Sequence, residues 1–321
     1  MSVLTTVSPD QMREYLKLYD LGQLRGMRGI QAGVTNTNYF VDTDKGRYVL
    51  TVFETLKLDE IPYFMKLKLH LNSRGVACPE PIALKDGRLC AELLGKPAAL
   101  ISRLKGAETA RPNAKQCRAV GAMQAKMHLA GEGSDLRMKN PRGFAWCKLA
   151  YDKVKSKMEP EEARLLGEEI RRLSQALGKI GGDEPGSVPG LPWGPIHADL
   201  FKDNALLDGN EVAGFIDFYY ACDGYFAYDL AVSLNDWARD PDSNAMIPEL
   251  EAAFMAGYES VRPLNRAEKD SFLDMRRWAC VRFWASRLLD WHFPPEGELT
   301  YAKDPTVFRD LLLAMRRLAG D

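Results

Sequence analysis

One short segment constrains this chain more than any other. His197, Asp199 and Asn204 lie within it, and Asp217 follows directly after an apolar run, Val212–Ile216. The runs before and after the segment predict short strands with a turn between them. Because these strands would end near one another, we expect the carboxylates and the amide to converge on one site. The prediction depends on order, spacing and strand ends together, since each residue alone is common in turns.

The residue types in this segment suit phosphoryl transfer from a magnesium nucleotide. Magnesium prefers oxygen ligands, and Asn204 and Asp217 offer an amide and a carboxylate oxygen, with water and phosphate completing the shell. Asp199 would accept a hydrogen bond from the acceptor hydroxyl and align it with the γ-phosphorus. His197 is predicted to support the loop, because a histidine base would duplicate Asp199.

Composition excludes several classes of protein. With 321 residues, the chain is long enough for two lobes. A formal net charge of −1 gives no basic field for nucleic acid or an anionic membrane, and we predict neither as a partner. No apolar run approaches the ~18 residues of a membrane span. Six scattered cysteines, and a start without signal-peptide features, predict reduced thiols in the cytoplasm.

The first part of the chain has the pattern of a small sheet. Residues 38–42 and 47–53 predict a hairpin, and residues 60–73 predict a helix. Short strands follow, and the last of them ends in a glycine turn. We expect a nucleotide-binding lobe at 1–102 and a catalytic and acceptor-binding lobe at 103–321.

Helical patterns dominate the second part. The predicted helices cover residues 114–129, 153–179, 227–238, 266–291 and 305–318. Residues 181–192 predict an exposed linker that leads into the central segment. The expected fold class is α+β, with a small antiparallel-sheet lobe and a larger, mainly helical lobe.

The central motifs resemble those of a known superfamily. His197-x-Asp199-x4-Asn204, followed by Ile216-Asp217-Phe218, is similar to the catalytic core of the aminoglycoside phosphotransferase and choline kinase superfamily. That resemblance implies a two-lobed, protein-kinase-like fold, with ATP and Mg²⁺ as cofactors. It also implies that Asp229, in Tyr228-Asp229-Leu230-Ala231, braces the catalytic loop.

Further segments resemble the bacterial homoserine kinase branch, and the likeness extends from about residue 8 to the C-terminus. They are Gly29–Phe40, Tyr48–Glu54, Pro97–Ile101, His197–Phe201, Ile216–Tyr219 and Leu234–Trp237. Membership of that branch would imply ATP-dependent phosphorylation of L-homoserine to O-phospho-L-homoserine, a step of threonine biosynthesis.

The resemblance also places a nucleotide site. A loop containing Gly33, Asn36 and Asn38 would cover the phosphates, because glycine allows close backbone approach and the amides can donate. Adenine would meet backbone groups between Ile101 and Arg103.

One position departs from the protein-kinase pattern. Thr51 stands where those enzymes carry a lysine that pairs with the α- and β-phosphates. Other cations must then supply countercharge. Arg47, Lys57 and Lys202 are the candidates, with Lys202 favoured because it lies inside the catalytic loop, and Glu60 loses its usual lysine partner.

The acceptor site is harder to place. Homoserine is a small zwitterion, so its site needs an anion for the ammonium and a cation or amide for the carboxylate. Tyr219, Asp236 and Arg282 are the candidates, although aromatic residues at helical spacing near Arg282 are as typical of a core.

Other functions remain open at this stage, and the oligomeric state is not predicted. A kinase for choline, ethanolamine, a sugar or an aminoglycoside fits the same motifs. A nucleotide-binding pseudokinase scaffold would have lost Asp199, Asn204 or Asp217, and all three are present. A metal-dependent hydrolase could use His197, Asp199 and Asp217, but no further histidine lies nearby.

Overall fold

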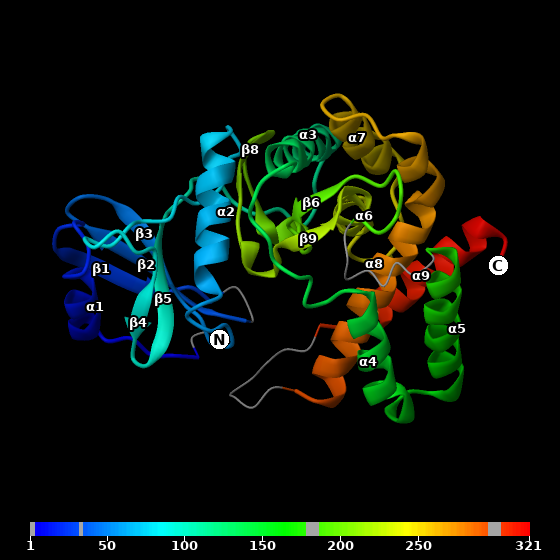
Figure 1. The fold of residues 1–321 in the computed structure, drawn as a ribbon, viewed down its shortest axis with the longest axis horizontal. Coiled ribbons are helices and arrows are strands. Elements are labelled where there is room, and N and C mark those ends of the chain that lie inside the picture. The colour runs from blue at the N-terminus through cyan, green and yellow to red at the C-terminus, as the bar shows by residue number, and fades with distance from the viewer. Residues whose placement is uncertain (1–3, 32–34, 178–185, 295–302) are drawn as a thin grey trace. The chain divides into compact units, whose positions relative to one another are not determined.

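The computed structural model describes residues 4–31, 35–177, 186–294 and 303–321. They form an antiparallel sheet with two helices, followed by a larger and mainly helical part (Figure 1). The chain divides into two compact units, and the break falls between Lys105 and Gly106. The predicted α+β fold class is confirmed.

The first unit is built on a five-stranded antiparallel sheet of order β1-β2-β3-β5-β4. Its elements are α1 (Pro9–Leu16), β1 (Leu24–Gly29), β2 (Thr37–Thr43), β3 (Arg47–Val52), α2 (Ile61–Ser73), β4 (Ala91–Leu93) and β5 (Lys96–Ser102). Ser8 and Gln11 form a capping box at the start of α1, as their spacing predicts.

Strand β1 is the part of this sheet that the sequence does not reveal. Its sequence, LRGMRG, has two arginines and two glycines, and none of its residues is buried. An edge strand needs no apolar face, so the period-two signal is missing. The predicted hairpin β2–β3 is present, with Asn38 opposite Thr51.

The second unit contains the remaining elements. They are α3 (Ala114–Gly131), α4 (Phe144–Val154), η1 (Lys155–Lys157), α5 (Pro160–Ala176), β6 (Trp193–Ile196), η2 (Lys202–Asn204), β7 (Ala205–Asp208), β8 (Glu211–Phe215), η3 (Phe218–Tyr220), β9 (Cys222–Tyr225), α6 (Phe226–Trp237), α7 (Pro248–Glu259), α8 (Arg266–His292) and α9 (Thr306–Ala319). Strands β6 and β9 pair with each other, as do β7 and β8.

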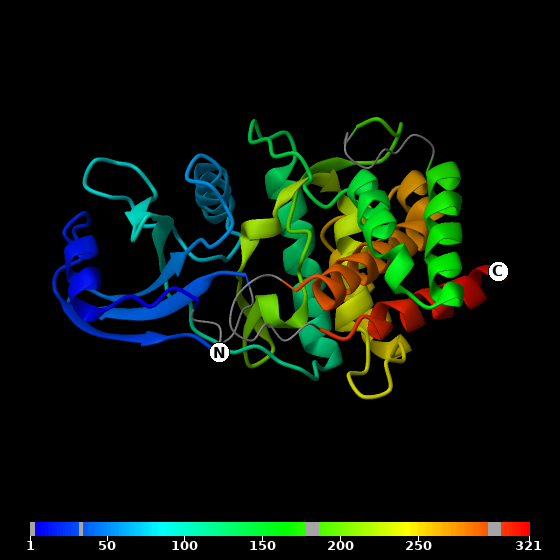
Figure 2. The same cartoon turned by 90° about the horizontal axis from the view of Figure 1, so that it is seen from below.

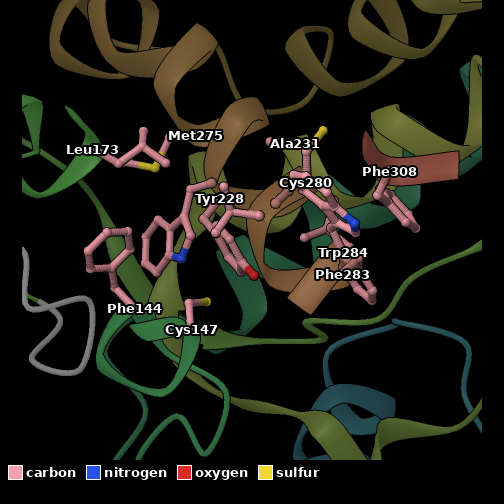
Figure 3. Packing of buried hydrophobic residues seen from close by; sticks show 14 of the residues in the cluster. Phe144, Cys147, Leu173, Tyr228, Ala231, Met275, Cys280, Phe283, Trp284 and Phe308 are labelled. Atoms are coloured by element: carbon pink, nitrogen blue, oxygen red, sulfur yellow. The ribbon is translucent and has the colours of Figure 1, made fainter. Parts of the chain in front are cut away.

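Helix α8 organises the second unit. It packs against α4, α5, α6 and α9, and Figure 2 shows these helices gathered around it. Aromatic side chains fill the space between them (Figure 3), with the rings of Phe283 and Phe308 stacked at 5.1 Å. Burying each such ring contributes about 1.5–3 kcal/mol to stability.

The prediction of one helix over residues 153–179 is wrong. Helix α4 ends at Val154, and α5 begins at Pro160. Glu159 is extended, with ψ 142°, because the ring of a following proline disfavours helical backbone in the preceding residue. The sequence analysis also missed α7, which is short and contains a glycine.

Candidate active site

The backbone of the predicted catalytic loop is fixed by one buried carboxylate. Asp229, in the first turn of α6, accepts hydrogen bonds from the amides of Ala198 at 2.6 Å and His197 at 3.3 Å. Ala198 has a positive φ of 62°, a strained conformation for a residue other than glycine. Burial acts to raise the pKa of Asp229, but bonds from His128 and these amides outweigh it and hold the pKa low.

A buried chain of side chains extends from Asp229 toward α7 and α8. His128 lies 2.9 Å from Asp229 and 2.7 Å from the hydroxyl of Tyr258, which also accepts from Arg262. The low pKa of Asp229 keeps it a carboxylate, which can only accept, so Nε2 of His128 donates to it. Burial lowers the pKa of His128, and the neutral ring accepts the Tyr258 proton at Nδ1. Arg262 is paired in turn with Glu268 at 2.9 Å. Sequence reasoning missed this chain, because a single histidine on an apolar helix face carries no specific signal.

His197 ties the loop to the segment that carries Asp217. Its Nε2 lies 2.9 Å from the carbonyl of Ile216, and the amide of Ile216 donates to the carbonyl of Asn204. Burial lowers the pKa of His197, so the neutral ring donates from Nε2 and leaves the buried Nδ1 without a partner. Asp217 follows with a φ of 57°, which turns the chain away from the direction of β8.

Asp199 and Asn204 lie against each other. Nδ2 of Asn204 donates to the backbone carbonyl of Asp199 at 2.8 Å and approaches its Oδ2 at 3.4 Å. With Nδ2 engaged in this way, Oδ1 of Asn204 is left as the acceptor. Asn204 directly precedes β7 and Asp217 follows β8, the strand that pairs with it, so the two residues lie at the same end of this pair of strands. An amide oxygen and a carboxylate are ligands that suit Mg²⁺, which takes its others from phosphate and water. Among the described residues, no three His, Cys, Asp or Glu side chains form a metal site.

Asp199 has the electrostatics of a group held for a ligand. Burial raises its pKa to about 7, Arg282 opposes that rise, and Asp217 and Asp203 add to it. Among the described residues, its carboxylate makes only the 3.4 Å contact with Asn204, so little in that part of the chain stabilises the charged form.

Lys202 and Asp236 are used within the loop. The amide of Lys202 donates to Oδ2 of Asp236 at 2.9 Å, and its buried Nζ donates to the carbonyl of Arg239. Oδ1 of Asp236 is paired with Arg239 at 3.1 Å. To meet a phosphate, the Lys202 ammonium would have to leave this carbonyl. Both oxygens of Asp236 hold the loop in place, and its contact with an acceptor stays a prediction.

Arg282 and Tyr219 occupy different environments near this loop. Arg282 lies on α8, is 4% exposed, and stacks on Phe283 at 3.8 Å and on Tyr220 at 5.4 Å. Tyr219 lies in η3, directly after the turn at Asp217, and is partly exposed.

In the first unit, the predicted phosphate loop is only partly described, and Gly33 lies outside the described residues. Asn36 is 5% exposed, and its Oδ1 is buried without a partner. Asn38 accepts a hydrogen bond from the hydroxyl of Thr51 at 2.8 Å. A neutral pair therefore occupies the place of the usual lysine, and Glu60 bonds to the amide of Lys57 instead.

The predicted adenine-binding backbone is already partly engaged. Ile101 pairs with Val49 in the sheet, and the amides of Ser102 and Arg103 donate to the carbonyls of Glu80 and Arg47. Two backbone N–H groups that the sequence offers for adenine, those of Ser102 and Arg103, are thus already hydrogen-bonded within the chain.

The guanidinium of Arg103 lies 3.9 Å from the ring centre of Phe40, and Arg28 lies 5.5 Å from the same ring. Phe40 and Asn38 are two residues apart on β2, so their side chains lie on one face of the sheet. The guanidinium groups of Arg28 and Arg103 therefore give positive charge to the face of the sheet that carries Asn38 and Phe40.

Comparison with known proteins shows which family the chain belongs to. The model of the phosphotransferase enzyme family matches residues 26–264. The chain is 53% identical to a homoserine kinase of Neisseria meningitidis serogroup B over 98% of its own length and 100% of that protein. It is 44% identical to a homoserine kinase of Methylobacillus flagellatus over 97% of its own length and 94% of that protein.

A solved structure shares the fold. An amicoumacin kinase, in complex with AMP-PNP, Ca²⁺ and Ami, superimposes with a TM-score of 0.73 at 14% identity. The match covers 97% of this chain and 92% of that one.

Proposed function

Because this chain belongs to the phosphotransferase enzyme family, we propose that it transfers the γ-phosphoryl group of ATP to the hydroxyl of L-homoserine. The products are O-phospho-L-homoserine and ADP. The observation that carries the proposal is the arrangement of Asp199 and Asn204 on one loop that is hydrogen-bonded to the segment of Asp217. Similarity to homoserine kinases over nearly the whole chain supports the choice of acceptor.

Asp199 would receive the acceptor hydroxyl. Its carboxylate makes few hydrogen bonds within the described chain, so it can accept one from the acceptor hydroxyl. That bond would align the hydroxyl oxygen with the γ-phosphorus. Asp229 and the buried chain behind it hold the backbone amides of this loop. Such positioning counts heavily because phosphoryl transfer has a loose transition state.

Asn204 and Asp217 would hold Mg²⁺. When bound, the ion neutralises charge on the phosphates of ATP. The chain's own contribution is to orient Oδ1 of Asn204, which the bond from Nδ2 to the Asp199 carbonyl does. Two protein oxygens suffice for an ion that keeps several waters and phosphate ligands.

The first unit, taken as residues 1–102, is proposed to bind the nucleotide, and residues 103–321 to bind the acceptor. Asn36 and Asn38 would meet the phosphates together with the loop around Gly33. Arg103, stacked on Phe40, offers positive charge on the same sheet face as Asn38. Lys202 remains a second source of positive charge only if it leaves the Arg239 carbonyl.

We place the reaction in the cytoplasm. All six cysteines are buried and none of them forms a disulfide, as expected where thiols stay reduced. None of the described helices is long and apolar enough to cross a membrane.

A panel of acceptors with coupled detection of ADP tests the proposed function. L-homoserine should give turnover that depends on Mg²⁺ and ATP, well above that with choline, ethanolamine or an aminoglycoside. Turnover with choline and none with homoserine would refute the acceptor assignment but leave the kinase intact.

A further inference from the structure

Helix α8 carries three buried arginines, and only two of them have acidic partners. Arg276 pairs with Glu251 at 2.7 Å, and Arg277 pairs with Glu169 at 2.6 Å. Arg282 has 4% of its surface exposed, yet it donates to no carboxylate or carbonyl among the described residues. Its contacts are the two rings of Tyr220 and Phe283.

A buried guanidinium without an acceptor is costly. Arginine stays charged and presents five N–H donors, and a charge with so little access to water is unfavourable unless it is paired. Ring faces offset only a small part of that cost. The guanidinium is therefore suited to bind an anion from solution.

A second arginine approaches the same ring from another segment. Arg142 precedes α4, stacks on Trp146 at 4.4 Å, and lies 6.0 Å from the ring centre of Tyr220. Its guanidinium also has no acidic partner among the described residues. Two guanidinium groups therefore flank Tyr220, which follows Asp217 in the chain by three residues.

One carboxylate, that of Asp290, interacts electrostatically with both arginines: desolvation raises its pKa, and their charges oppose that rise. Asp290 is exposed near the end of α8. Asp290 forms no ion pair with either of them within the described part of the chain. It follows Arg282 by two helical turns, so both lie on one face of α8. Arg282 also acts on the charge of Asp199.

We propose that this face of α8 binds the amino-acid end of the acceptor: Arg282, with Arg142 beside it, binds the α-carboxylate, and Asp290 binds the α-ammonium. Arg282 is bidentate toward a planar carboxylate, and the aromatic rings hold its guanidinium plane in place. The site selects α-amino acids over plain amino alcohols. This inference rests on the proposed function, because the hydroxyl at the other end must reach Asp199.

Substrate analogues that lack the carboxylate or the ammonium test the two proposed contacts separately. Arg282→Met should lower kcat/KM for L-homoserine about 100-fold, mainly through KM, with the KM for ATP unchanged. For L-homoserinamide, which has no carboxylate, the same substitution should change kcat/KM less than about 3-fold. Arg282→Lys should recover part of the loss. Arg266→Met, at the exposed start of the same helix, is the matched control and should behave as wild type.

Asp290→Asn tests the other end. It should lower kcat/KM for L-homoserine about 10-fold. For 4-hydroxybutanoate, which has no ammonium, kcat/KM should stay within about 2-fold of wild type. Thermal unfolding of every variant checks that the fold is kept. Because Arg282 has no partner to leave behind, Arg282→Met should unfold at or above the wild-type temperature.

The outcomes are distinguishable. If wild type phosphorylates homoserine but Arg282→Met loses homoserine and homoserinamide equally, the arginine acts on the phosphoryl group or on Asp199, and the inference fails alone. If wild type does not phosphorylate homoserine, the proposed function fails and the inference falls with it.

Discussion

The two halves of α8 use charge in opposite ways. In the first half, Arg276 and Arg277 are buried and each is bonded to a carboxylate of another helix. In the second half, Arg282 is as deeply buried but forms no ion pair within the described part of the chain, and its charge acts on Asp290, an exposed carboxylate that is also without an ion pair there. Burial alone therefore does not mark a functional charge. A buried charge without a partner does, because the fold gains nothing from keeping it.

Two aspartates near the catalytic loop repeat this contrast. Asp229 accepts hydrogen bonds from two backbone amides and from His128, and its pKa lies below the usual range. Asp199 has one long contact and a pKa raised to about 7. The first carboxylate is satisfied by the chain, and the second is prepared for a ligand.

The largest expected effect comes from Asp199. Asp199→Ala should lower kcat on the order of 10²–10⁴-fold, because the acceptor hydroxyl loses the group that orients it. Nucleotide binding should persist, as measured by calorimetric titration with ATP. The unfolding temperature should stay close to that of wild type, since the carboxylate contributes almost no hydrogen bonding. Near-full activity would remove Asp199 from the mechanism.

Breaking a satisfied pair should act on stability instead. Arg277→Met removes the closer partner of the buried Glu169, which keeps the longer contact with Arg172 at 3.3 Å, and this should cost about 3 kcal/mol in the free energy of unfolding. The double variant Arg277→Met/Glu169→Leu should recover most of that loss. Urea denaturation measures both. An equally large loss in the double variant would mean that packing, and not the unpaired carboxylate, is responsible.

Acid should destabilise the protein through its buried histidines. Burial lowers the pKa of His128 and His197, so both stay neutral when folded and take up a proton on unfolding. Stability from these groups is present above their unfolded pKa, about 6.5, and is lost as pH falls below it. Each contributes a slope of about 1.4 kcal/mol per pH unit.

Denaturation of His128→Gln between pH 6.5 and 5 checks this. The number of protons taken up on unfolding should fall by about one, which lowers the slope of the unfolding free energy against pH by about 1.4 kcal/mol per pH unit. The contribution of His197, roughly half of the total from the two histidines, should remain. An unchanged slope would show that His128 is protonated in the folded state.

The smallest effect should be that of Arg282→Met on stability. No carboxylate is stranded by the change, and methionine can fill the space between Tyr220 and Phe283. The free energy of unfolding should change by less than about 1 kcal/mol. A loss as large as that of Arg277→Met would make Arg282 a structural residue and remove the contrast along α8.

Much of the fold follows from local pattern. Apolar periodicity located α2, α3, α6, α8 and α9, and alternating strands with a turn located the β2–β3 hairpin. The pattern fails where the context is not local. Strand β1 lies at an edge and has no buried residue, and Pro160 divides a charged stretch that otherwise looks like one helix.

The residues of the candidate site also differ in how far the sequence predicts their placement. The placement of Asp199, Asn204 and Asp217 on one loop and the adjacent strand end is predictable because β7 and β8 pair, and their catalytic role stays a prediction. Lys202 is adjacent in sequence to this chemistry, but its ammonium bonds to Arg239, and no sequence signal gives a side chain's direction. Asp290 and Arg142 could not be predicted, because their relation to Arg282 depends on how α4 and η3 pack against α8.

The most direct test is the product itself, followed by ³¹P NMR with ATP, Mg²⁺ and L-homoserine. The account predicts a phosphomonoester signal of O-phospho-L-homoserine that grows with wild type and is nearly absent with Asp199→Asn. Formation of that product at equal rates by both proteins, or release of inorganic phosphate in its place, would contradict it.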